Sequence, residues 1–341
     1  MLQYIILHIC KKLKSFWEKI AVKENIIGAN DAGQRLDKFL SKAYGSMPKS
    51  LMYKYIRLKR IKINGKRADI AYKLCEGDRV TLYINDELLE PKAQRFEFTS
   101  APANIDIVYE DDNILLVNKP EGLSVHPDND EYRDTLIFRI QHYLYKKGEY
   151  NPNSEMSFKP ALANRIDRNT CGIVIAAKTA NALRILNQKI KSRELDKRYL
   201  CVVHGKMPKS SDTLTGYLEK DEENNIVTVS KRMRENSKTI KTQYTVLKER
   251  DGLSLLEVRL LTGRTHQIRA HLAAIGHPLL GDGKYGVNKA DRKLGFVHQA
   301  LCSYKLKFDF KTDAGELEYL NGREFTVKSV WFAKKLFNFD L

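Results

Sequence analysis

Apolar residues near the start of the chain recur at helical spacing, and further on they alternate as they do in strands. The first predicted helix is marked by Leu36, Phe39, Leu40 and Ala43 and the second by Leu51, Tyr55 and Leu58. Met47-Pro48 separates the two helices. A hairpin turning at Asn64-Gly65 and the alternating strand RVTLYI follow. The pattern predicts a small unit of two helices, a hairpin and a strand.

From Ile105 onward strands predominate. IDIVYEDDNILLVNKPEG predicts two strands, and GIVIAAK, KRYLCVVHG, TQYTVLKE and LSLLEVRLL predict four more. One helix follows GIVIAAK, with Leu183, Leu186 and Ile190 as its apolar stripe. Strands in short groups with few helices between them favour an α+β domain over a doubly wound α/β one. The polar stretch DELLEPKAQRFEFTSAPA, residues 86–103, is expected to link the two regions.

Charge changes this picture of an ordinary globular chain. The net charge is +17 and the pI is near 9.5, which favours a polyanionic partner: nucleic acid first, an anionic membrane surface second. Solubility without a partner is the plainer reading. The segment from Gln34 to Ile70 holds eleven Lys or Arg against two Asp. Lys54 and Arg57 lie there on the second helix, where a basic run is either a solvated face or an RNA contact.

Several site classes lack their sequence signals. The five cysteines are scattered and form no C-x-x-C pair, so neither a disulfide framework nor zinc is indicated, and a reducing cytosol is expected. The sequence GDGKYG lacks the spacing of a phosphate-binding loop. The first apolar run ends at Lys11, too short to span a bilayer. Residues 1–23 are interpreted as an extension, either an amphipathic helix or the product of an upstream start codon.

Three motifs could carry chemistry. In NRIDRNTCG, Asp167 stands between Arg165 and Arg168, whose charges would hold a carboxylate ionised; alternatively, Asp167 only forms a turn. In GRTHQIRAHL, Arg269 could pair bidentately with a carboxylate or phosphate. In KRYLCVVHG, Tyr199 is either a stacking platform for an extruded base or a core residue.

The first of these regions resembles a known RNA-binding module. The order QRLDKFL, IKINGK and EGDRV, within residues 24–85, is similar to the module named after ribosomal small-subunit protein four. The remainder is similar to another family. VYEDDNILLVNKPEGLSVHP, NRIDRNTCG, KRYLCVVHG and GRTHQIRAHLAAIGHPLLGDGKYG resemble, in the same order, the motifs of RluA-type pseudouridine synthases of large-subunit rRNA and tRNA.

The resemblance implies a role for each motif. Asp167 would be the catalytic carboxylate, Arg269 its ion-pair partner, and Tyr199 the residue that stacks on the target uracil. The expected substrate-binding residues are Arg165, which would enter the RNA where the uridine is flipped out, with Arg264, His266, Gln267, Lys54 and Arg57. Lys119 and Pro120 would brace the active-site loop. Asn164, Ile166 and Cys171 depart from the usual His-Arg-Leu-Asp-x-x-Thr-Ser-Gly pattern, so the RNA placement normally made by that histidine is open.

The expectation is an α+β isomerase that converts uridines of RNA to pseudouridine, without cofactor or metal. Its catalytic domain, residues 104–341, would contain a mixed, largely antiparallel sheet flanked by helices, preceded by the small basic module of residues 24–85. We expect a cytoplasmic monomer with no membrane partner, acting on large-subunit rRNA or, alternatively, tRNA. A non-catalytic RNA-binding or ribosome-assembly factor is one alternative. A hydrolase using His266 or His271 is another, although no Ser or Cys nucleophile motif accompanies them.

Overall fold

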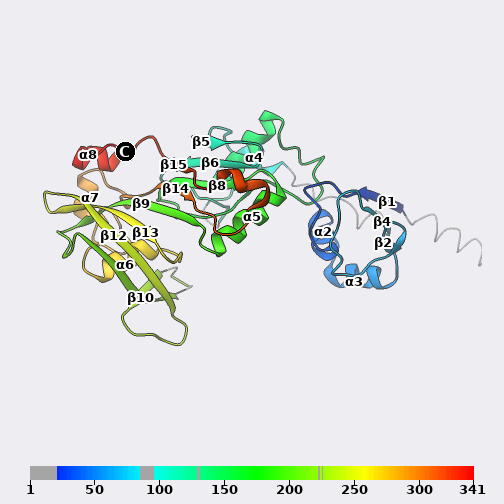
Figure 1. Ribbon diagram of the computed structural model, residues 1–341, viewed down its shortest axis with the longest axis horizontal. Helices are drawn as coiled ribbons and strands as arrows, with labels where there is room; N and C mark the ends of the chain where they lie inside the picture. Colours follow the sequence, from blue (N-terminus) through cyan, green and yellow to red (C-terminus); the bar gives the residue numbers. More distant parts are fainter. Residues whose placement is uncertain (1–20, 85–95, 129–130, 222, 225) are drawn as a thin grey trace, which may run out of the picture. The chain divides into compact units, whose positions relative to one another are not determined.

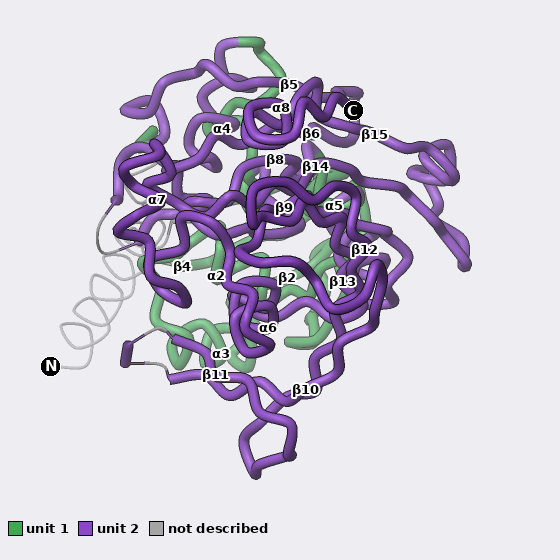
Figure 2. Tube along the Cα trace, turned by 90° about the vertical axis from the view of Figure 1, so that its left-hand side faces the viewer, with its two compact units in different colours: residues 1–97, 147–159, 179–181 green, residues 98–146, 160–178, 182–341 purple. Residues whose placement is uncertain are grey.

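The computed structural model describes the chain except for residues 1–20, 85–95, 129–130, 222 and 225 (Figure 1). Its contacts divide it into two compact units (Figure 2). Residues 1–97, 147–159 and 179–181 form the first, and residues 98–146, 160–178 and 182–341 form the second. The interpretation of residues 1–20 lies outside the described residues, and the domain boundaries drawn from the sequence remain a prediction.

The first unit packs two helices against a four-stranded antiparallel sheet. The helices are α2 (Leu36–Ala43) and α3 (Lys49–Arg57), and the strands follow the order β1 (Ala21–Ile26), β4 (Arg79–Ile84), β2 (Ile61–Ile63) and β3 (Lys66–Arg67). The predicted helices and hairpin are therefore confirmed. Strand β1 is an addition, and it crosses residue 24, where the module was expected to begin.

One face of the first unit differs from the prediction. The buried residues of α3 are Met52 and Ile56, whereas Leu58 is 51% exposed. The reason is the length of the helix, which ends at Arg57, so that Leu58 lies beyond its last turn. Met52 and Ile56 pack with Leu36, Phe39 and the inner residues of β2 and β4 in one apolar core. The basic residues of α3 are left on its outer surface.

The second unit is built on an 11-stranded sheet. Nine strands follow the order β11 (Ile226–Ser230), β10 (Ser211–Asp221), β12 (Lys238–Arg250), β13 (Leu253–Leu260), β9 (Leu195–His204), β14 (Leu301–Phe308), β8 (Cys171–Ala177), β6 (Ile114–Lys119) and β5 (Ile107–Glu110). Strand β15 (Glu324–Thr326) pairs with β14, and β7 (Ala161–Leu162) pairs with β8. The β14–β8 pair is parallel and the other described pairs are antiparallel. The mixed, largely antiparallel α+β fold is thereby confirmed.

Helices cover parts of this sheet. They are α4 (Leu136–Lys147), α5 (Ala180–Lys191), α6 (Gln267–Ala274), α7 (Lys289–Lys293) and α8 (Trp331–Phe337), with 3-10 turns η2 (Glu97–Ser100) and η3 (Gly315–Leu320). None of the helices in the described ranges combines the length and the apolar character that a membrane crossing requires. The turn η2 falls in the expected linker, where Phe98 is buried against His142 and Tyr145.

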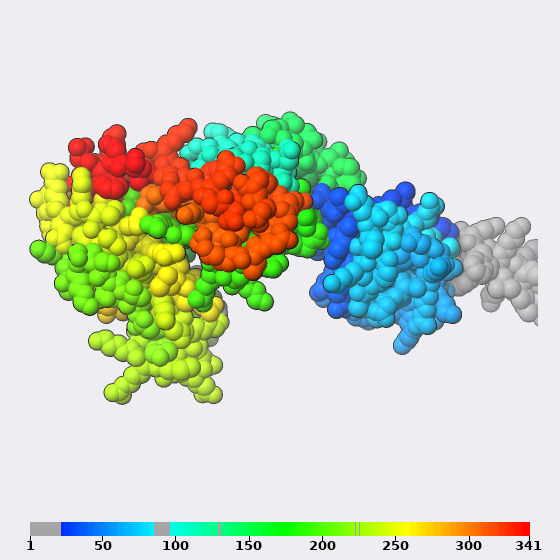
Figure 3. Space-filling model, in the orientation of Figure 1, coloured from blue at the N-terminus to red at the C-terminus, as the bar shows by residue number. Residues whose placement is uncertain are grey.

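The two faces of the sheet have different contents. Leu200 and Val202 of β9 join Leu186 of α5 and Phe332 of α8 in the main core. Because side chains alternate along a strand, Tyr199 points to the opposite face. On that opposite face a smaller cluster of Leu218, Val227, Ile240 and Ala270 packs α6 onto β10, β11 and β12. Figure 3 shows this end of the sheet, coloured yellow-green, projecting from the rest of the unit.

Glycine permits the parallel pair β14–β8 at the point where a candidate motif ends. Gly172, with φ of +109°, lies opposite Ser303, and a Cβ at this position would lie 2.3 Å from the Ser303 carbonyl oxygen. Any side chain would force the strands apart. The close approach brings the Asp167 turn, which precedes β8, to the strand next to β9. Strands β10, β11 and β14 are additions to those predicted. Their apolar residues fall in short runs or at irregular spacing, so the sequence pattern does not mark these segments as strands.

Candidate functional site

Asp167 lies in a tight turn that feeds β8. Its carbonyl accepts a hydrogen bond from the Thr170 amide at 3.0 Å, which confirms the turn. Its side chain is 26% exposed, and Oδ2 accepts a hydrogen bond from Nη1 of Arg269 at 3.0 Å. The ion pair joins residues 102 positions apart in the sequence. The carboxylate is therefore both held by a cation and accessible from outside.

Arg269 is clamped by a second carboxylate. Its Nε and Nη2 donate to Asp282 Oδ2 and Oδ1 at 2.7 and 2.9 Å, a bidentate pair whose planar geometry orients the guanidinium. The Asp282 side chain is fully buried, and it also accepts the backbone amides of Lys284 and Tyr285. Because the clamp occupies two nitrogens of Arg269, the third is directed at Asp167.

Burial and charge act in opposite directions on this pair. Burial alone would raise the pKa of Asp282, but hydrogen bonds and charge from Arg269 lower it below the usual value. For Arg269, burial opposes the charged form, yet Asp282 and then Asp167 raise the pKa of the guanidinium. Asp282 and Arg269 therefore stay charged together. Removing the arginine would leave a buried carboxylate unpaired, which costs about 3–5 kcal/mol.

Backbone geometry places Asp282. The preceding Gly281 has φ of +79°, and a Cβ there would lie 2.2 Å from the His298 carbonyl oxygen. Only glycine fits this close backbone approach. The Gly281 amide also donates to Asp291 at 2.8 Å, which holds the turn from its other side. The segment GDGKYG thus serves to present the Asp282 carboxylate to α6.

His266 is the second basic group beside Asp167. Its Nε2 lies 3.8 Å from Asp167 Oδ2, and its Nδ1 lies 2.8 Å from the hydroxyl of Tyr285. It precedes the first turn of α6 with φ of 51°, a left-handed conformation that is uncommon outside glycine. Burial lowers the pKa of the imidazole, and the nearby charges of Asp167 and Arg269 oppose one another. His266 is therefore neutral near pH 7.

Tyr199 lies on the site face of β9, next to Ser303 of β14. It is 6% exposed, and the Ser303 side chain lowers the pKa of its hydroxyl in opposition to the larger effect of burial. Burial raises the pKa of the phenol to about 12, with a smaller contribution from the charge of Asp167. The hydroxyl is consequently protonated in the working pH range. The charge of Asp167 acts on the Tyr199 phenol, so the two predicted catalytic residues share one electrostatic environment, and the stacking role of Tyr199 remains a prediction.

Lys119 holds the turn that carries Asp167 through hydrogen bonds from inside the protein. The side chain is fully buried at the end of β6, and its ammonium donates to the carbonyls of Pro120, Leu123 and Arg168 at 2.7, 2.8 and 2.7 Å. These bonds use all three ammonium hydrogens. Burial lowers the pKa of Lys119 to about 8. The expected bracing by this lysine is confirmed in its contacts, since it ties residues 120–123 to the turn that carries Asp167.

The arginines that flank Asp167 do not hold it, which corrects the prediction from the local sequence. Arg168 turns away to Asp128, at 3.0 and 3.1 Å, and to Ser124 at 2.8 Å. Arg165 is exposed and lies near His126, whose pKa its charge helps to lower after the larger effect of burial. Sequence neighbours in a turn point in different directions, so the stabilising cation comes from a distant helix instead.

Asn164 and the residues of the GRTHQ turn have different environments. Asn164 Oδ1 accepts the Ile175 amide at 2.8 Å inside the protein, so the residue in the usual histidine position has a scaffold contact. Arg264 is exposed. Gln267, expected to bind substrate, is 2% exposed, and its amide bonds to Thr262, the Lys241 carbonyl and Thr242. These bonds give Gln267 a function in holding the turn, and a substrate contact stays a prediction.

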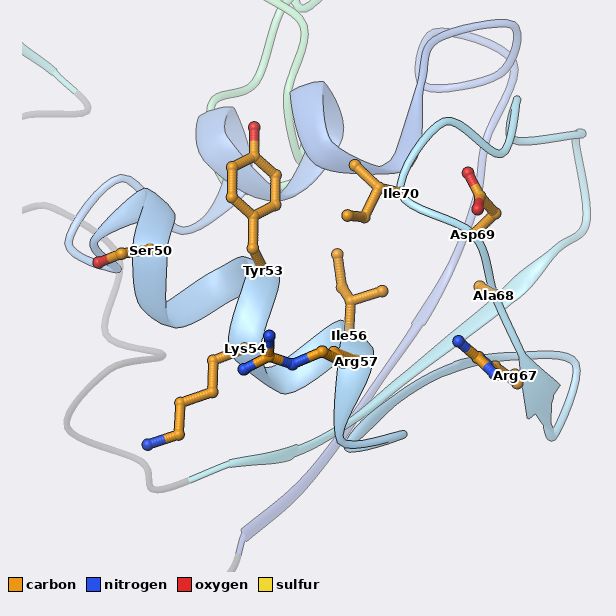
Figure 4. A pocket seen from close by; sticks show the side chains of 9 residues that line it. All are labelled: Ser50, Tyr53, Lys54, Ile56, Arg57, Arg67, Ala68, Asp69 and Ile70. Carbon is orange, nitrogen blue, oxygen red and sulfur yellow. The ribbon is translucent and has the colours of Figure 1, made fainter.

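A second candidate site lies wholly within the first unit. A pocket of about 550 Å³ lies between α3 and residues 67–70. Figure 4 shows the side chains that line it. Its floor is apolar, with Ile56 and Ile70 pointing toward one another, and Lys54, Arg57 and Arg67 stand around it (Figure 4). Lys54 and Arg57 are exposed, as predicted. Exposed cations around a pocket of this kind suit the phosphates of a nucleic acid.

Two residues of the site escaped the sequence reasoning. Asp282 and Tyr285 both lie in GDGKYG, which ends the last of the four family motifs but in which the sequence assigns no role to either residue. The available signal was an aspartate enclosed by glycines thirteen residues after Arg269. No group of three or more His, Cys, Asp or Glu within the described residues is arranged to hold a metal ion.

Comparisons with known proteins identify the family. The RNA pseudouridylate synthase family model matches residues 113–274, and the S4 domain model matches residues 34–80. The chain is 33% identical over 290 residues to an RNA pseudouridine synthase of Mycoplasma genitalium, covering 83% of this chain and 88% of that protein. It is 33% identical over 305 residues to the ribosomal large subunit pseudouridine synthase C of Salmonella typhi, covering 85% and 90%.

Solved structures share the fold. Human RNA pseudouridylate synthase domain containing 1 superposes with a TM-score of 0.50 at 22% identity, covering 72% of this chain and 96% of that one. At this identity the likeness concerns the fold alone. The relatives in Mycoplasma genitalium and Salmonella typhi carry the functional assignment, which favours an isomerase over the pure RNA-binding factor and the hydrolase. The chain belongs to the RNA pseudouridine synthase family, enzymes that isomerise uridine in RNA, and it carries an S4 RNA-binding domain ahead of its catalytic region.

Proposed function

We propose that Asp167 is the catalytic group of this pseudouridine synthase. The observation that carries the proposal is the 3.0 Å ion pair between the partly exposed Asp167 and the clamped, buried Arg269. A carboxylate held in this way is ionised, oriented and open to a ligand on one side. Those are the requirements of a nucleophile or a base.

The reaction breaks the bond between ribose C1′ and uracil N1, turns the base, and joins C1′ to C5; the C5–H bond then breaks as C5 loses its proton, and N1 takes up a proton. Asp167 either attacks C1′ and is later displaced, or removes the C2′ proton while the base is detached and then returns it. In both routes Arg269 keeps the carboxylate charged before and after the step. The buried phenol of Tyr199 supplies a flat surface beside the detached uracil. Since the product is an isomer of the substrate, no redox partner enters the balance.

A paired uridine must leave its helix before Asp167 can reach it. Extrusion costs a few kcal/mol, which protein contacts to the base and the phosphates offset. Arg165 is suited to fill the vacated position, because it is exposed two residues before Asp167. Arg264 is exposed at the other end of the site, in the turn before His266. Lys54 and Arg57 of the S4 domain add affinity through phosphate contacts.

Large-subunit rRNA is the substrate that we propose, with tRNA as the alternative. The support is the similarity to the ribosomal large subunit pseudouridine synthases C, together with the separate S4 domain, whose cations suit a large, structured RNA. An enzyme on this substrate would work in the cytoplasm, and we propose that it acts as a monomer.

The test is a map of pseudouridine in rRNA and tRNA from cells that lack the gene. We expect loss of modification at one or a few large-subunit rRNA positions and its return with the wild-type gene, but not with Asp167→Asn. Loss confined to tRNA would reassign the substrate. Full restoration by Asp167→Asn would contradict the catalytic assignment.

A further inference from the structure

A series of contacts leads from β11 through Tyr285 and His266 to Asp167. The catalytic roles proposed for Asp167 and Arg269 do not account for it. Tyr285 contacts one residue of α6 and the residue that precedes it: its ring centroid lies 5.2 Å from the Arg269 guanidinium carbon, and its hydroxyl lies 2.8 Å from His266 Nδ1. The same hydroxyl accepts the Val227 amide of β11 at 3.0 Å. Tyr285 therefore connects the projecting end of the sheet with both basic groups at the Asp167 carboxylate.

The hydrogen bonds around His266 determine which of its two ring nitrogens carries the proton. The neutral imidazole has one N–H donor and one acceptor nitrogen. If Nδ1 accepts the proton of the Tyr285 hydroxyl, Nε2 keeps its hydrogen and directs it toward the negative Asp167. The opposite tautomer would set a lone pair of Nε2 against the carboxylate. The amide of Val227 already occupies one lone pair of the hydroxyl, so donation to Nδ1 satisfies every group in the chain.

Both basic residues address the same oxygen of Asp167. Arg269 Nη1 and His266 Nε2 face Oδ2, at 3.0 and 3.8 Å. The longer distance exceeds a hydrogen bond, and catalytic contacts of this kind commonly tighten when substrate binds. Oδ1 is then the oxygen that meets the ribose. The left-handed backbone of His266 (φ of 51°) is a conformation that costs free energy outside glycine, and such strain is often found at functional sites.

We propose that Tyr285 is a positioning residue that fixes His266 as its Nε2–H tautomer, so that His266 and Arg269 together restrain Oδ2 of Asp167 and leave Oδ1 to react. This inference rests on the proposed catalytic function of Asp167. Because Val227 belongs to β11, the same series of contacts couples the position of the projecting strands to the position of the catalytic carboxylate. The residue acts through His266 and does not itself touch the substrate.

The decisive variant is Tyr285→Phe, which removes one oxygen and keeps the ring packed on Arg269. We expect kcat to fall about tenfold, within the range for outer-shell hydrogen bonds, with KM changed less than twofold. The matched control is Tyr319→Phe, because that hydroxyl also donates a hydrogen bond to a side chain, here to Asp111 at 2.6 Å, in another part of the second unit. Equal turnover of the Tyr285→Phe and Tyr319→Phe proteins would overturn the proposal.

The pH profile supplies a readout that a merely structural role would not move. The charged groups facing His266 are Asp167 from the turn before β8, Arg269 from α6, and Asp282 and Lys284 from the following turn. Loss of the Tyr285 proton donor destabilises the neutral imidazole, so the pKa of His266 rises. The acidic limb of kcat should move to higher pH in Tyr285→Phe. An unmoved limb would contradict the proposal.

Two further measurements do not depend on Tyr285→Phe folding well. Glutamine can place an N–H near the position of Nε2, whereas asparagine reaches only that of Nδ1, so His266→Gln should retain at least about fivefold more turnover than His266→Asn. In the wild-type protein, the ¹⁵N shifts of His266 should show unprotonated Nδ1 and protonated Nε2; the reverse would overturn the proposal. Should Asp167→Asn remain active, the proposed function itself fails; should it be inactive while His266 shows the reverse tautomer, only this inference fails.

Discussion

The two units use their arginines in different ways. In the catalytic unit, Arg269 has a 9% exposed side chain, donates to two carboxylates, and has one orientation available to it. In the S4 unit, Lys54 and Arg57 are exposed around a pocket, and their long side chains are free to adapt. Chemistry on one carboxylate needs a cation with fixed geometry, whereas affinity for a phosphate backbone needs charge alone.

The difference also separates stability from function. A buried arginine between two carboxylates cannot be removed without cost to the fold, because a charge is left unpaired. Exposed cations contribute little to stability, so they can be exchanged to suit an RNA surface. The catalytic unit and the S4 unit should therefore respond to mutation in separable ways, one in turnover and stability and the other in affinity and salt dependence.

The largest effect is expected from Arg269→Met. Turnover should fall on the order of 1,000-fold, the range seen when a single charge-stabilising group is removed from an active site. The free energy of unfolding should fall by about 3–5 kcal/mol, because Asp282 remains buried. RNA affinity, measured by filter binding at fixed salt, should stay within threefold. The control is Arg139→Met, since Arg139 also pairs bidentately with a carboxylate, Asp134, at 2.7 Å, but with partial exposure. Equal losses of RNA affinity and turnover would recast Arg269 as a phosphate contact.

Asp282→Asn comes next. The amide keeps the shape of the side chain but cannot accept two charged hydrogen bonds, so Arg269 is no longer held toward Asp167. We expect kcat to fall about 10- to 100-fold, as for other groups that orient a reactive one. Asp134→Asn is the matched control, because it breaks the same bidentate geometry away from the site. Wild-type turnover of Asp282→Asn, measured on folded protein, would show that the clamp does not matter.

An intermediate effect concerns pH. The pKa of Lys119 is lowered by burial to about 8, from an ordinary value of 10.5, so the ammonium loses a proton and one of its three carbonyl bonds as pH rises through 8. Turnover should decline above that pH. The free energy of unfolding should change in the other direction. Between pH 8 and 10.5 the unfolded chain binds the Lys119 proton more tightly than the folded protein does, so the contribution of Lys119 to stability increases as pH rises. Lys119→Met should be less active and lack the alkaline decline; an unchanged decline would assign it to another group.

The smallest effect on turnover belongs to the S4 unit. The double variant Lys54→Ala, Arg57→Ala should lower RNA affinity several-fold and reduce the slope of log Kd against log salt by about 1.4, for two lost phosphate contacts. The value of kcat at saturating RNA should stay within twofold. Lys206→Ala with Arg250→Ala serves as the control, since both are exposed cations of the catalytic unit. A similar change of slope in the control would remove the distinction between the two surfaces.

The sequence anticipates the fold better than the site. Apolar alternation predicts β9, β12 and β13, because each strand buries one face in a regular sheet. The third motif also identifies Tyr199. It does not identify Asp282, because the importance of that carboxylate lies in a contact with Arg269 across a turn. The charges next to Asp167 in NRIDRNTCG suggest the wrong partners, since Arg168 points to Asp128. The motif resemblance names the right one, since Arg269 forms the ion pair with Asp167.

Other differences have local physical causes. The strand β1 was not expected, because its six residues mix polar and apolar positions and gain their order by pairing with β4. The face of α3 was shifted by one residue, because so short a helix lets either of two neighbouring stripes look apolar in the sequence. Gln267 was grouped with substrate-binding residues through its motif, yet its amide is used inside the protein.

The central claim concerns one carboxylate, and Asp167→Asn tests it most directly. The amide is nearly isosteric with the acid but neither nucleophilic nor basic, and Asp167 is 26% exposed, so folding should tolerate the change. The measurement is pseudouridine formation on large-subunit rRNA by purified protein, with RNA affinity and thermal unfolding followed in parallel. We expect no turnover above background, with affinity within threefold of the wild type. Normal turnover by folded Asp167→Asn protein would contradict the account.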